Sequence, residues 1–337
     1  MADQNRKPPT LKTIAELTGL SLSTVSLSLR DGSKLKQETR DKIARAAAEV
    51  GYVPNRAGVR LRTGQTNVLT LVLSPAKNTI DYTRQLIEGI GRHLSGTKYH
   101  LNVIPDLQGA TPADSVAYVL QNRSADGVIL THTSARDPRV QMLIDAGFPF
   151  VSHGRTEFYA DHAFHDFHAE RFVEMAVERL LARGRKRLVL VAEDDATTNF
   201  SKLAGGFHRT LAAHGMTGEV ATETGILVST DTARAFGQSL ARRAHPFDAI
   251  ISNNELATLA LMGGMGDQGM ELGRHYDLVC RQTTQILPTL YPTIDTVGED
   301  LVATGTELAR LLIGRVNGAP ISSLQTLHEP TAQWRSS

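Results

Sequence analysis

The sequence of 337 residues contains a single cysteine, Cys280, and only 5% aromatic residues. One cysteine excludes an internal disulfide framework and fits a reducing compartment. Apolar runs of about 18 residues, the length that a membrane-spanning helix needs, are also missing. The first residues, MADQNRKPPT, lack the apolar core of a secretory signal. We therefore expect a cytoplasmic protein that has no membrane partner.

The net charge is only +1, but basic residues are concentrated near the N-terminus. Residues 1–64 hold twelve Lys or Arg against six Asp or Glu, so this segment carries +6 and the rest of the chain −5. A small basic segment on an acidic body indicates a polyanionic partner for the basic segment alone. Chance clustering on a solvated surface is the alternative that charge by itself leaves open.

Three short helical patterns lie within residues 10–50. The first begins after Thr10, a capping residue, and ends at Gly19; the second is SLSTVSLSLR, and the third is QETRDKIARAAAEVG. The apolar face expected for the first helix consists of Leu11, Ile14, Ala15 and Leu17. Two short helices joined by a tight turn that contains Gly, followed by a third that closes the core, are typical of a helix-turn-helix DNA-binding domain.

The second of these helices is rich in serine and is expected to face DNA. Val25 and Leu29 are spaced to dock on the first helix. The outward face then consists of Leu22, Ser23, Ser26 and Leu27. Small hydroxyl side chains let a helix approach phosphates and base edges closely, and Ser or Thr can bond to either. Serines that only make a surface helix soluble are the alternative.

A basic segment, NRAGVRLRTG, follows at residues 55–64. It has three arginines and almost no apolar stripe, and an isolated helix of about two turns is unstable in water. This composition suits a hinge that becomes ordered only with DNA and a second copy of the chain. A plain basic linker is the alternative.

From residue 67 onward, apolar strands alternate with amphipathic helices, and the alternation restarts near residue 170. Apolar strands separated by helices favour parallel sheets that are covered on both faces. We therefore expect an α/β core of two doubly wound lobes, with a ligand bound in the cleft at the carboxyl ends of the strands.

The N-terminal segment also carries a specific motif. TLKTIAELTGLSLSTVSLSLRDG, followed by TRDKIARAAAEVGYVPNRAGVRLRTG, resembles the heads of regulators of the lactose-repressor (LacI/GalR) family. The phrases ADGVILTH, PFVSHGR and DAIISNNELATLAL fall in family order, so the resemblance covers essentially the whole chain. NRAGVRLRTG and RQT resemble a subgroup that regulates α-glucoside operons.

The resemblance implies a regulator, expected to be a repressor, of a carbohydrate uptake or catabolism operon. Such proteins are homodimers, in some members tetramers, that bind near-palindromic operator DNA. Their core is similar to periplasmic binding proteins and holds a small sugar effector between its lobes, with no other cofactor. The expected domains are a helix-turn-helix head over 1–53, a hinge helix over 54–65 and a core over 66–337. Within the core, one lobe is expected at about 66–160 and 292–322, and the other at about 161–291 and 323–337.

Motif position also implies which residues contact DNA. They are Thr10, Ser21, Leu22, Ser23, Thr24, Ser26, Leu27, Arg30, Asn55, Arg56, Gly58 and Leu61. Leu22 and Ser23 would read bases, and Leu61 would be the wedge that enters the minor groove and permits a bend. Leu27 stands where the family usually has Arg. Leucine cannot form two hydrogen bonds to guanine, but it can pack on a thymine methyl group, so the operator sequence should differ.

For the cleft, motif position implies a set of polar effector-binding residues. They are Asp81, Tyr82, Thr83, His153, Arg155, Lys202, Asn253 and Gln282. Lys202 precedes Leu203, which stands where the family has a cleft Arg, and Gln282 replaces a sugar-binding Asp. Aromatic and amide groups suit stacking on a sugar ring and bonding its hydroxyls. We expect a neutral or weakly charged sugar-like ligand.

An enzyme and an exported sugar-binding protein on the same α/β core are the competing interpretations. FHDFH places His165, Asp166 and His168 at a spacing similar to metal ligands, but no second cluster follows. No phosphate-binding loop or nucleophile elbow follows a suitable strand. We therefore expect no catalytic residue, metal or enzymatic activity. The basic head and the missing export signal argue against an exported binding protein.

Overall fold

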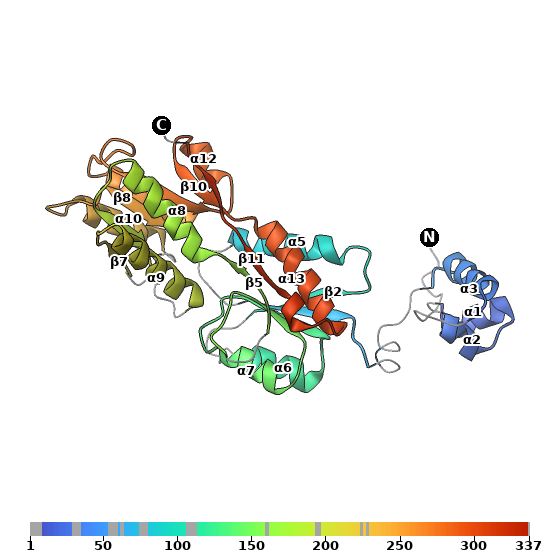
Figure 1. Ribbon diagram of the computed structural model, residues 1–337. Coiled ribbons are helices and arrows are strands. Elements are labelled where there is room, and N and C mark those ends of the chain that lie inside the picture. Colours follow the sequence, from blue (N-terminus) through green and yellow to red (C-terminus); the bar gives the residue numbers. More distant parts are fainter. Residues whose placement is uncertain are drawn as a thin grey trace. The chain divides into compact units, whose positions relative to one another are not determined.

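The computed structural model describes residues 9–28, 35–52, 60, 64–73, 80–105, 113–158, 162–192, 197–222, 225–226 and 229–335. The chain forms two compact units, residues 1–66 and residues 67–337. The smaller unit is helical where it is described, and the larger unit contains all of the described strands (Figure 1). Five residues expected to contact DNA lie outside the described residues: Arg30, Asn55, Arg56, Gly58 and Leu61.

The smaller unit contains α1 (Leu11–Thr18), α2 (Leu22–Ser28) and α3 (Gln37–Glu49). Thr10 caps α1 as predicted: its side chain accepts a hydrogen bond from the Thr13 amide, and the Thr13 hydroxyl accepts one from the Thr10 amide. Gly19 ends the helix in the left-handed region, at φ 66°, which favours glycine. These local signals determine where α1 begins and ends, and packing determines how the three helices are arranged.

A small apolar core joins the three helices. Its fully or largely buried members are Ile14, Val25, Ile43 and Ala46. Leu17, which the sequence places on the apolar face of α1, is instead 55% exposed, and Thr18 is buried. At about 100° per residue, Leu11, Ile14, Ala15 and Thr18 share one arc of the helix and Leu17 falls outside it.

The first sheet of the larger unit has the strand order β11-β5-β4-β3-β1-β2, with every neighbouring pair parallel. Its strands are β1 (Val68–Leu73), β2 (His100–Pro105), β3 (Gly127–Leu130), β4 (Phe150–His153), β5 (Ala163–Phe167) and β11 (Gln325–His328). Helices α5 (Ile80–Leu94) and α13 (Leu301–Val316) cover one face, and α6 (Asp114–Asn122) and α7 (Pro138–Asp145) cover the other (Figure 1).

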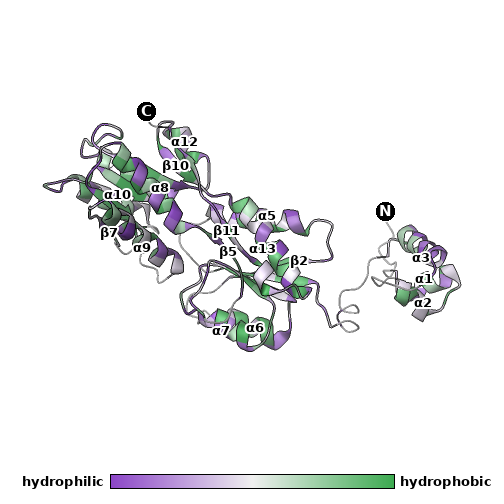
Figure 2. Ribbon diagram, viewed as in Figure 1, coloured by the Kyte–Doolittle hydropathy of each residue, from purple (hydrophilic) through white to green (hydrophobic). Residues whose placement is uncertain are grey.

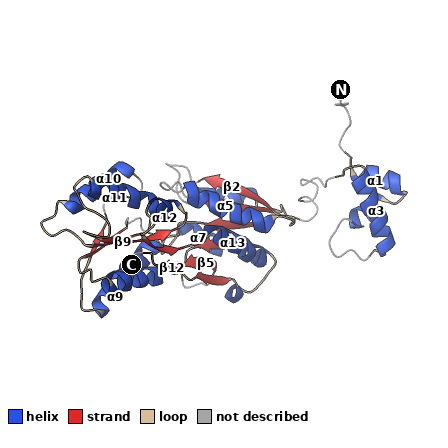
Figure 3. Cartoon of the chain, turned by 90° about the horizontal axis from the view of Figure 1, so that it is seen from above, coloured by secondary structure: helices blue, strands red, loops and turns tan. Residues whose placement is uncertain are grey.

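The second sheet has the order β12-β10-β9-β8-β6-β7 and is parallel except for β12. Its strands are β6 (Leu188–Val191), β7 (Glu219–Ala221), β8 (Ala249–Ser252), β9 (Asp277–Gln282), β10 (Asp295–Gly298) and β12 (Thr331–Gln333). Helices α8 (Ala169–Ala182) and α9 (Thr198–Ala213) cover one face, and α10 (Thr230–Ala241) and α11 (Glu255–Gly266) cover the other (Figure 3). Two short elements complete the unit, α12 (Ile286–Leu290) and the 3-10 helix η1 (Ile321–Ser323).

Both sheets are covered on both faces, which explains the apolar strands. In β1, Leu69 and Leu71 pack under α5 and α13, whereas Val72 packs against the α6 and α7 side. Most covering helices mix apolar and polar residues along the chain (Figure 2), as helices that bury one face do, whereas α11 is apolar along nearly its whole length. None of the helices within the described ranges has the length and apolar character needed to span a bilayer.

The lobe limits differ from those expected at three strands. β5 pairs with β4 in the first sheet, β10 pairs with β9 in the second, and β11 pairs with β5 in the first. The chain therefore passes between the lobes after β5, after β10 and after β11. Alternation of strands and helices identifies each strand, but it does not say which of two parallel sheets a strand joins.

Candidate functional site

A cleft lies between the two lobes of the larger unit, where β3, β4, β5 and β9 end and α9 begins. Its lining residues are Tyr82, His132, Thr133, His153, Gly154, Asp166, Phe167, Thr197, Thr198, Asn199 and Arg281. Open α/β sheets bind ligands beyond the carboxyl ends of their strands. The cleft therefore has the position of a ligand site.

Tyr82, on α5, and His153, at the end of β4, form a partly buried pair. The Tyr82 hydroxyl lies 2.5 Å from Nδ1 of His153, and the rings stack with centroids 5.8 Å apart. Burial lowers the pKa of His153 to about 3 and raises the pKa of Tyr82 above its ordinary value. Both side chains are therefore neutral near pH 7 and offer polar atoms without charge.

Asp166, at the end of β5, brings two cations together. Its Oδ2 accepts hydrogen bonds from Lys202 Nζ at 2.6 Å and from Arg155 Nε at 2.7 Å. Burial by itself would raise the pKa of Asp166, but the two cations hold it below its ordinary value. Because Lys202 belongs to α9, this ion pair connects the second lobe to the first.

Arg281, on β9, is the cation that lines the cleft itself. Its guanidinium carbon lies 4.2 Å from the centroid of the Phe167 ring, and its Nε donates to Oε2 of the buried Glu299 at 2.7 Å. Oε1 of Glu299 lies 3.8 Å from Nε2 of His153. Each charged residue among the described lining residues thus has an oppositely charged partner.

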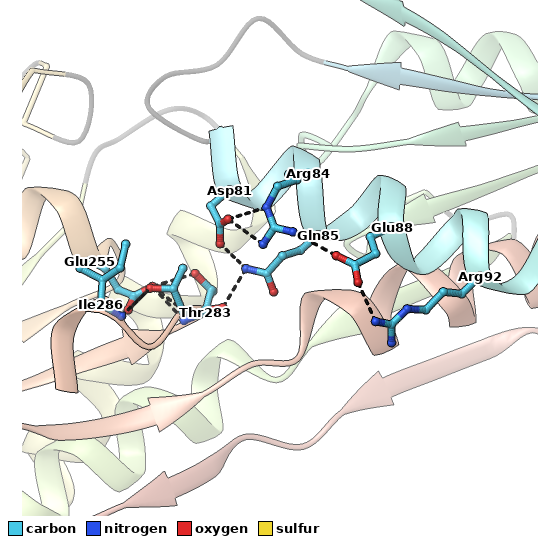
Figure 4. A network of polar contacts seen from close by, with 9 residues as sticks. Asp81, Arg84, Gln85, Glu88, Arg92, Glu255, Thr283 and Ile286 are labelled. Carbon is cyan, nitrogen blue, oxygen red and sulfur yellow. Dashed lines mark hydrogen bonds and ion pairs between the residues drawn. The ribbon is translucent and has the colours of Figure 1, made fainter. Parts of the chain in front are cut away.

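Hydrogen bonds also join the lobes on either side of the cleft. The amide of Thr198 donates to the carbonyl oxygen of Thr133 at 3.1 Å. Gln85, on α5, donates to the carbonyl oxygen of Thr283 at 2.9 Å, and within the second lobe the Glu255 carboxylate accepts from the amide and hydroxyl of Thr283 (Figure 4). These contacts favour the arrangement in which the lobes are close together.

The residues predicted to bind the effector fall into three groups. Tyr82 and His153 line the cleft. Arg155 and Lys202 do not line it, and instead form ion pairs with the lining residue Asp166. Asp81 pairs with Arg84 on the surface of α5 (Figure 4), and Thr83 on the same helix is not among the described lining residues.

Asn253 and Gln282 occupy different environments. Oδ1 of Asn253, directly after β8, is buried and has no hydrogen-bond partner among the described residues. Neither Asn253 nor Gln282 is among the described lining residues, and the Gln282 side chain accepts a hydrogen bond from the Thr296 hydroxyl at 2.6 Å. Successive side chains of a strand point to opposite faces, so Arg281 reaches the cleft and Gln282 does not.

Sequence reasoning missed nine of the lining residues. They are His132, Thr133, Gly154, Asp166, Phe167, Thr197, Thr198, Asn199 and Arg281. Asp166 and Phe167 lie within FHDFH, which was considered only for metal binding. His132 and Thr133 come one residue after the apolar run GVIL, and the strand-end rule could have found them. Within the part of the chain that is described, no group of three or more His, Cys, Asp or Glu side chains is arranged to hold a metal ion.

In the smaller unit, α2 exposes the face that the sequence predicts. Val25 is buried, whereas Leu22 is 53% exposed and Leu27 is 39% exposed. The Ser21 hydroxyl accepts from the Thr24 amide at 3.1 Å and lies 2.8 Å from the hydroxyls of both Ser23 and Thr24. Ser21 therefore starts the helix, and these hydroxyls already bond to one another.

Comparison with known proteins accounts for both units. Residues 10–55 match the family described as "Bacterial regulatory proteins, lacI family", and residues 66–315 match "Periplasmic binding proteins and sugar binding domain of LacI family". The chain belongs to the LacI family. It is thus a DNA-binding transcriptional regulator with a domain of the sugar-binding type, in a family of regulators rather than enzymes.

Relatives within the LacI family match nearly the whole chain. The regulator CelR of Thermobifida fusca is 26% identical over 321 residues, covering 94% of each chain. The regulator AglR of Rhizobium meliloti is 27% identical over 321 residues, covering 92% of this chain and 88% of its own. These nearly equal identities do not single out an α-glucoside subgroup.

Solved structures of the LacI family share the fold. The lac repressor dimer bound to operator and the anti-inducer ONPF is 19% identical with a TM-score of 0.81, and covers 98% of this chain and 99% of its own. The CelR–cellobiose complex is 24% identical with a TM-score of 0.70, and covers the same shares of the two chains.

Proposed function

We propose that this regulator represses an operon for carbohydrate uptake or catabolism and releases its operator when a neutral sugar binds in the cleft. The observation that carries the proposal is the lining of the cleft, which combines aromatic rings, hydroxyls and charges that are already paired. CelR, a relative of similar length, has been solved with cellobiose. A regulator of transcription acts on DNA in the cytoplasm.

The chemistry of the lining favours a neutral polyhydroxylated ring. Tyr82 and Phe167 place aromatic rings in the lining, and Thr133, Thr197 and Thr198 bring hydroxyls that can donate and accept. A phosphate group would need cations with free hydrogen-bonding capacity. Arg281 is held by Glu299, and Lys202 by Asp166, so a neutral sugar fits better than a sugar phosphate.

Asn253 is the further residue that we assign to the effector. A buried amide oxygen without a partner is costly, and a ligand hydroxyl would satisfy it. The cross-lobe bonds favour one of two arrangements of the lobes. A sugar that prefers one arrangement shifts operator affinity by the difference between its binding free energies for the two, typically about 1–3 kcal/mol. We expect a homodimer on a near-palindromic operator; the lac repressor has been solved as a dimer bound to operator.

A gel-shift titration tests the proposal. The full chain is titrated onto the DNA upstream of its own gene, without ligand and with cellobiose, maltose, raffinose or glucose 6-phosphate. A neutral sugar should weaken operator binding, and the phosphate should have no effect. Lack of any response to the neutral sugars, or a response to the phosphate alone, would contradict the assignment of the ligand class.

A pair of variants tests whether the response of operator binding to sugar depends on Asn253. Asn253→Ala should lose the sugar response and keep the operator affinity of the unliganded protein. Thr83→Val serves as the matched control, because Thr83 is polar and follows the cleft residue Tyr82 but, unlike Asn253, is not among the described residues that bury a polar atom without a partner. An Asn253→Ala protein that responds as the wild type does would remove Asn253 from the site.

A further inference from the structure

The second helix of the smaller unit, α2, contains only a few types of side chain. Its described residues, Leu22–Ser28, read LSTVSLS and contain no Arg, Lys, Asn, Gln, Asp or Glu; Arg30, which was expected to contact DNA, lies outside the described residues. In a helix-turn-helix domain the second helix lies in the major groove, and its side chains contact base edges. Here these side chains are leucines, small hydroxyls and one buried valine.

This composition limits which bases α2 can read. Pairs of hydrogen bonds select guanine through Arg or Lys and adenine through Asn or Gln, and a carboxylate accepts from cytosine. All of these side-chain types are missing from α2. Thymine is distinguished in the major groove by its C5-methyl group, which is recognised by apolar contact. Leu22 and Leu27 are 53% and 39% exposed and can provide that contact.

The hydroxyls of α2 distinguish bases less well than the side chains that form pairs of hydrogen bonds or contact methyl groups. The hydroxyl of Ser21, directly before α2, lies 2.8 Å from the hydroxyls of Ser23 and Thr24, and a hydroxyl bonds to donors and acceptors alike. Charge supplies affinity without selecting bases: twelve Lys or Arg against six Asp or Glu in residues 1–64 favour phosphates of any sequence. The leucines are therefore the side chains of α2 best suited to discriminate bases.

We infer that this head reads its operator through thymine methyl groups, with Leu22 and Leu27 as the contacting side chains. The inference rests on the proposed function of the head as an operator-binding domain. Each operator half-site should contain thymines that face α2, and base-specific affinity should depend on their methyl groups.

Replacing single thymines by deoxyuridine tests this, because the change removes only the methyl group. Operator fragments that carry dU at one half-site position at a time are titrated with the full chain by fluorescence anisotropy. We expect about fourfold weaker binding for each contacted methyl, which corresponds to the burial of one CH₂-sized group. Equal affinity for the dT and dU operators at every position would overturn the inference.

Two variants connect the methyl groups to named side chains. Leu27→Ala and Leu22→Ala should each bind the dT operator more weakly and become insensitive to dU at the position that the missing side chain contacts. Both leucines are exposed, so these variants should fold, which circular dichroism checks. Leu27→Ala and Leu22→Ala proteins with wild-type operator affinity would show that the leucines serve another contact and would overturn the inference.

The test separates this inference from the function on which it rests. A protein that prefers its operator over random DNA but ignores the methyl groups refutes methyl reading and keeps the regulator. A protein that binds operator and random DNA equally, whatever the thymine content, refutes the operator-binding function itself.

Discussion

The Tyr82 hydroxyl lies 2.5 Å from Nδ1 of His153, and this contact joins α5 to the end of β4 inside the cleft. Removing the hydroxyl in Tyr82→Phe leaves a buried nitrogen without its partner and removes a polar group from the lining. We expect sugar affinity to fall about fivefold to twentyfold, or about 1–2 kcal/mol, measured by calorimetry. Operator affinity without sugar should stay within about twofold. Unchanged sugar binding would show that the pair lies outside the ligand site.

The ion pair between Lys202 and Asp166 should stabilise the arrangement in which the lobes are close. Lys202→Met removes this cross-lobe bond without changing a lining residue. We expect sugar affinity to fall about tenfold and the radius of gyration from small-angle scattering to rise. Arg234→Met is the control, because Arg234 pairs with Asp267 within the second lobe. Equal behaviour of the two variants would contradict a role in closure.

The buried histidines predict a loss of stability on acidification. Burial lowers the pKa of His153 to about 3 and of His165 to about 4, against about 6.5 in an unfolded chain. Between these values the unfolded state binds more protons, so stability is fully present above about pH 6.5 and falls toward pH 4. The charged and titratable groups that act on the two imidazoles are Asp166, Glu299, Glu307, Arg281, His132 and His328.

Urea unfolding at pH 7 and pH 5 measures this effect. The wild type should lose roughly 1–2 kcal/mol per buried histidine between the two values. His165→Gln should reduce that loss, whereas His100→Gln, at an exposed position on β2, should not. An identical loss in all three proteins would assign the pH dependence to other groups.

Close packing of α5 against α13 predicts a contrast between two glycines of one helix. A Cβ at Gly89 would overlap the carbonyl oxygen of Val302 on α13, whereas a Cβ at Gly91 meets no atom within 4 Å. Gly89→Ala should destabilise the core by about 1–3 kcal/mol through overpacking. Gly91→Ala should stabilise it by up to about 1 kcal/mol through helix propensity. Thermal unfolding of the two variants should therefore shift in opposite directions.

Local rules predicted much of this fold. Thr10 and Gly19 mark the ends of α1 through capping chemistry that depends only on neighbouring residues. The apolar runs that became strands followed from burial on both faces. The partner of each strand did not follow, because β5 and β10 have the same local pattern whichever sheet they join. Leu17 was assigned to the apolar face of α1 because it is apolar, although the helical period alone places it outside the buried arc.

The candidate site was predictable to a lesser extent. Tyr82 and His153 were predicted from motif position, and the cleft lies at the ends of the strands as expected. Arg155 and Lys202 were expected to meet the ligand, but the structure places both on Asp166. Such pairing depends on contacts between residues far apart in the chain, which spacing in one sequence does not reveal. Arg281 and Gln282 differ by one position, and only the pleat of β9 decides which of them enters the cleft.

The most direct test of the account measures the coupling between sugar and operator in both directions. Operator affinity is measured with and without the most active neutral sugar of the panel, and sugar affinity is measured with and without saturating operator. The account predicts that each ligand weakens the other by the same factor, within the range of about 5- to 150-fold typical of allosteric coupling. A sugar that binds in the cleft and leaves operator affinity unchanged would contradict it.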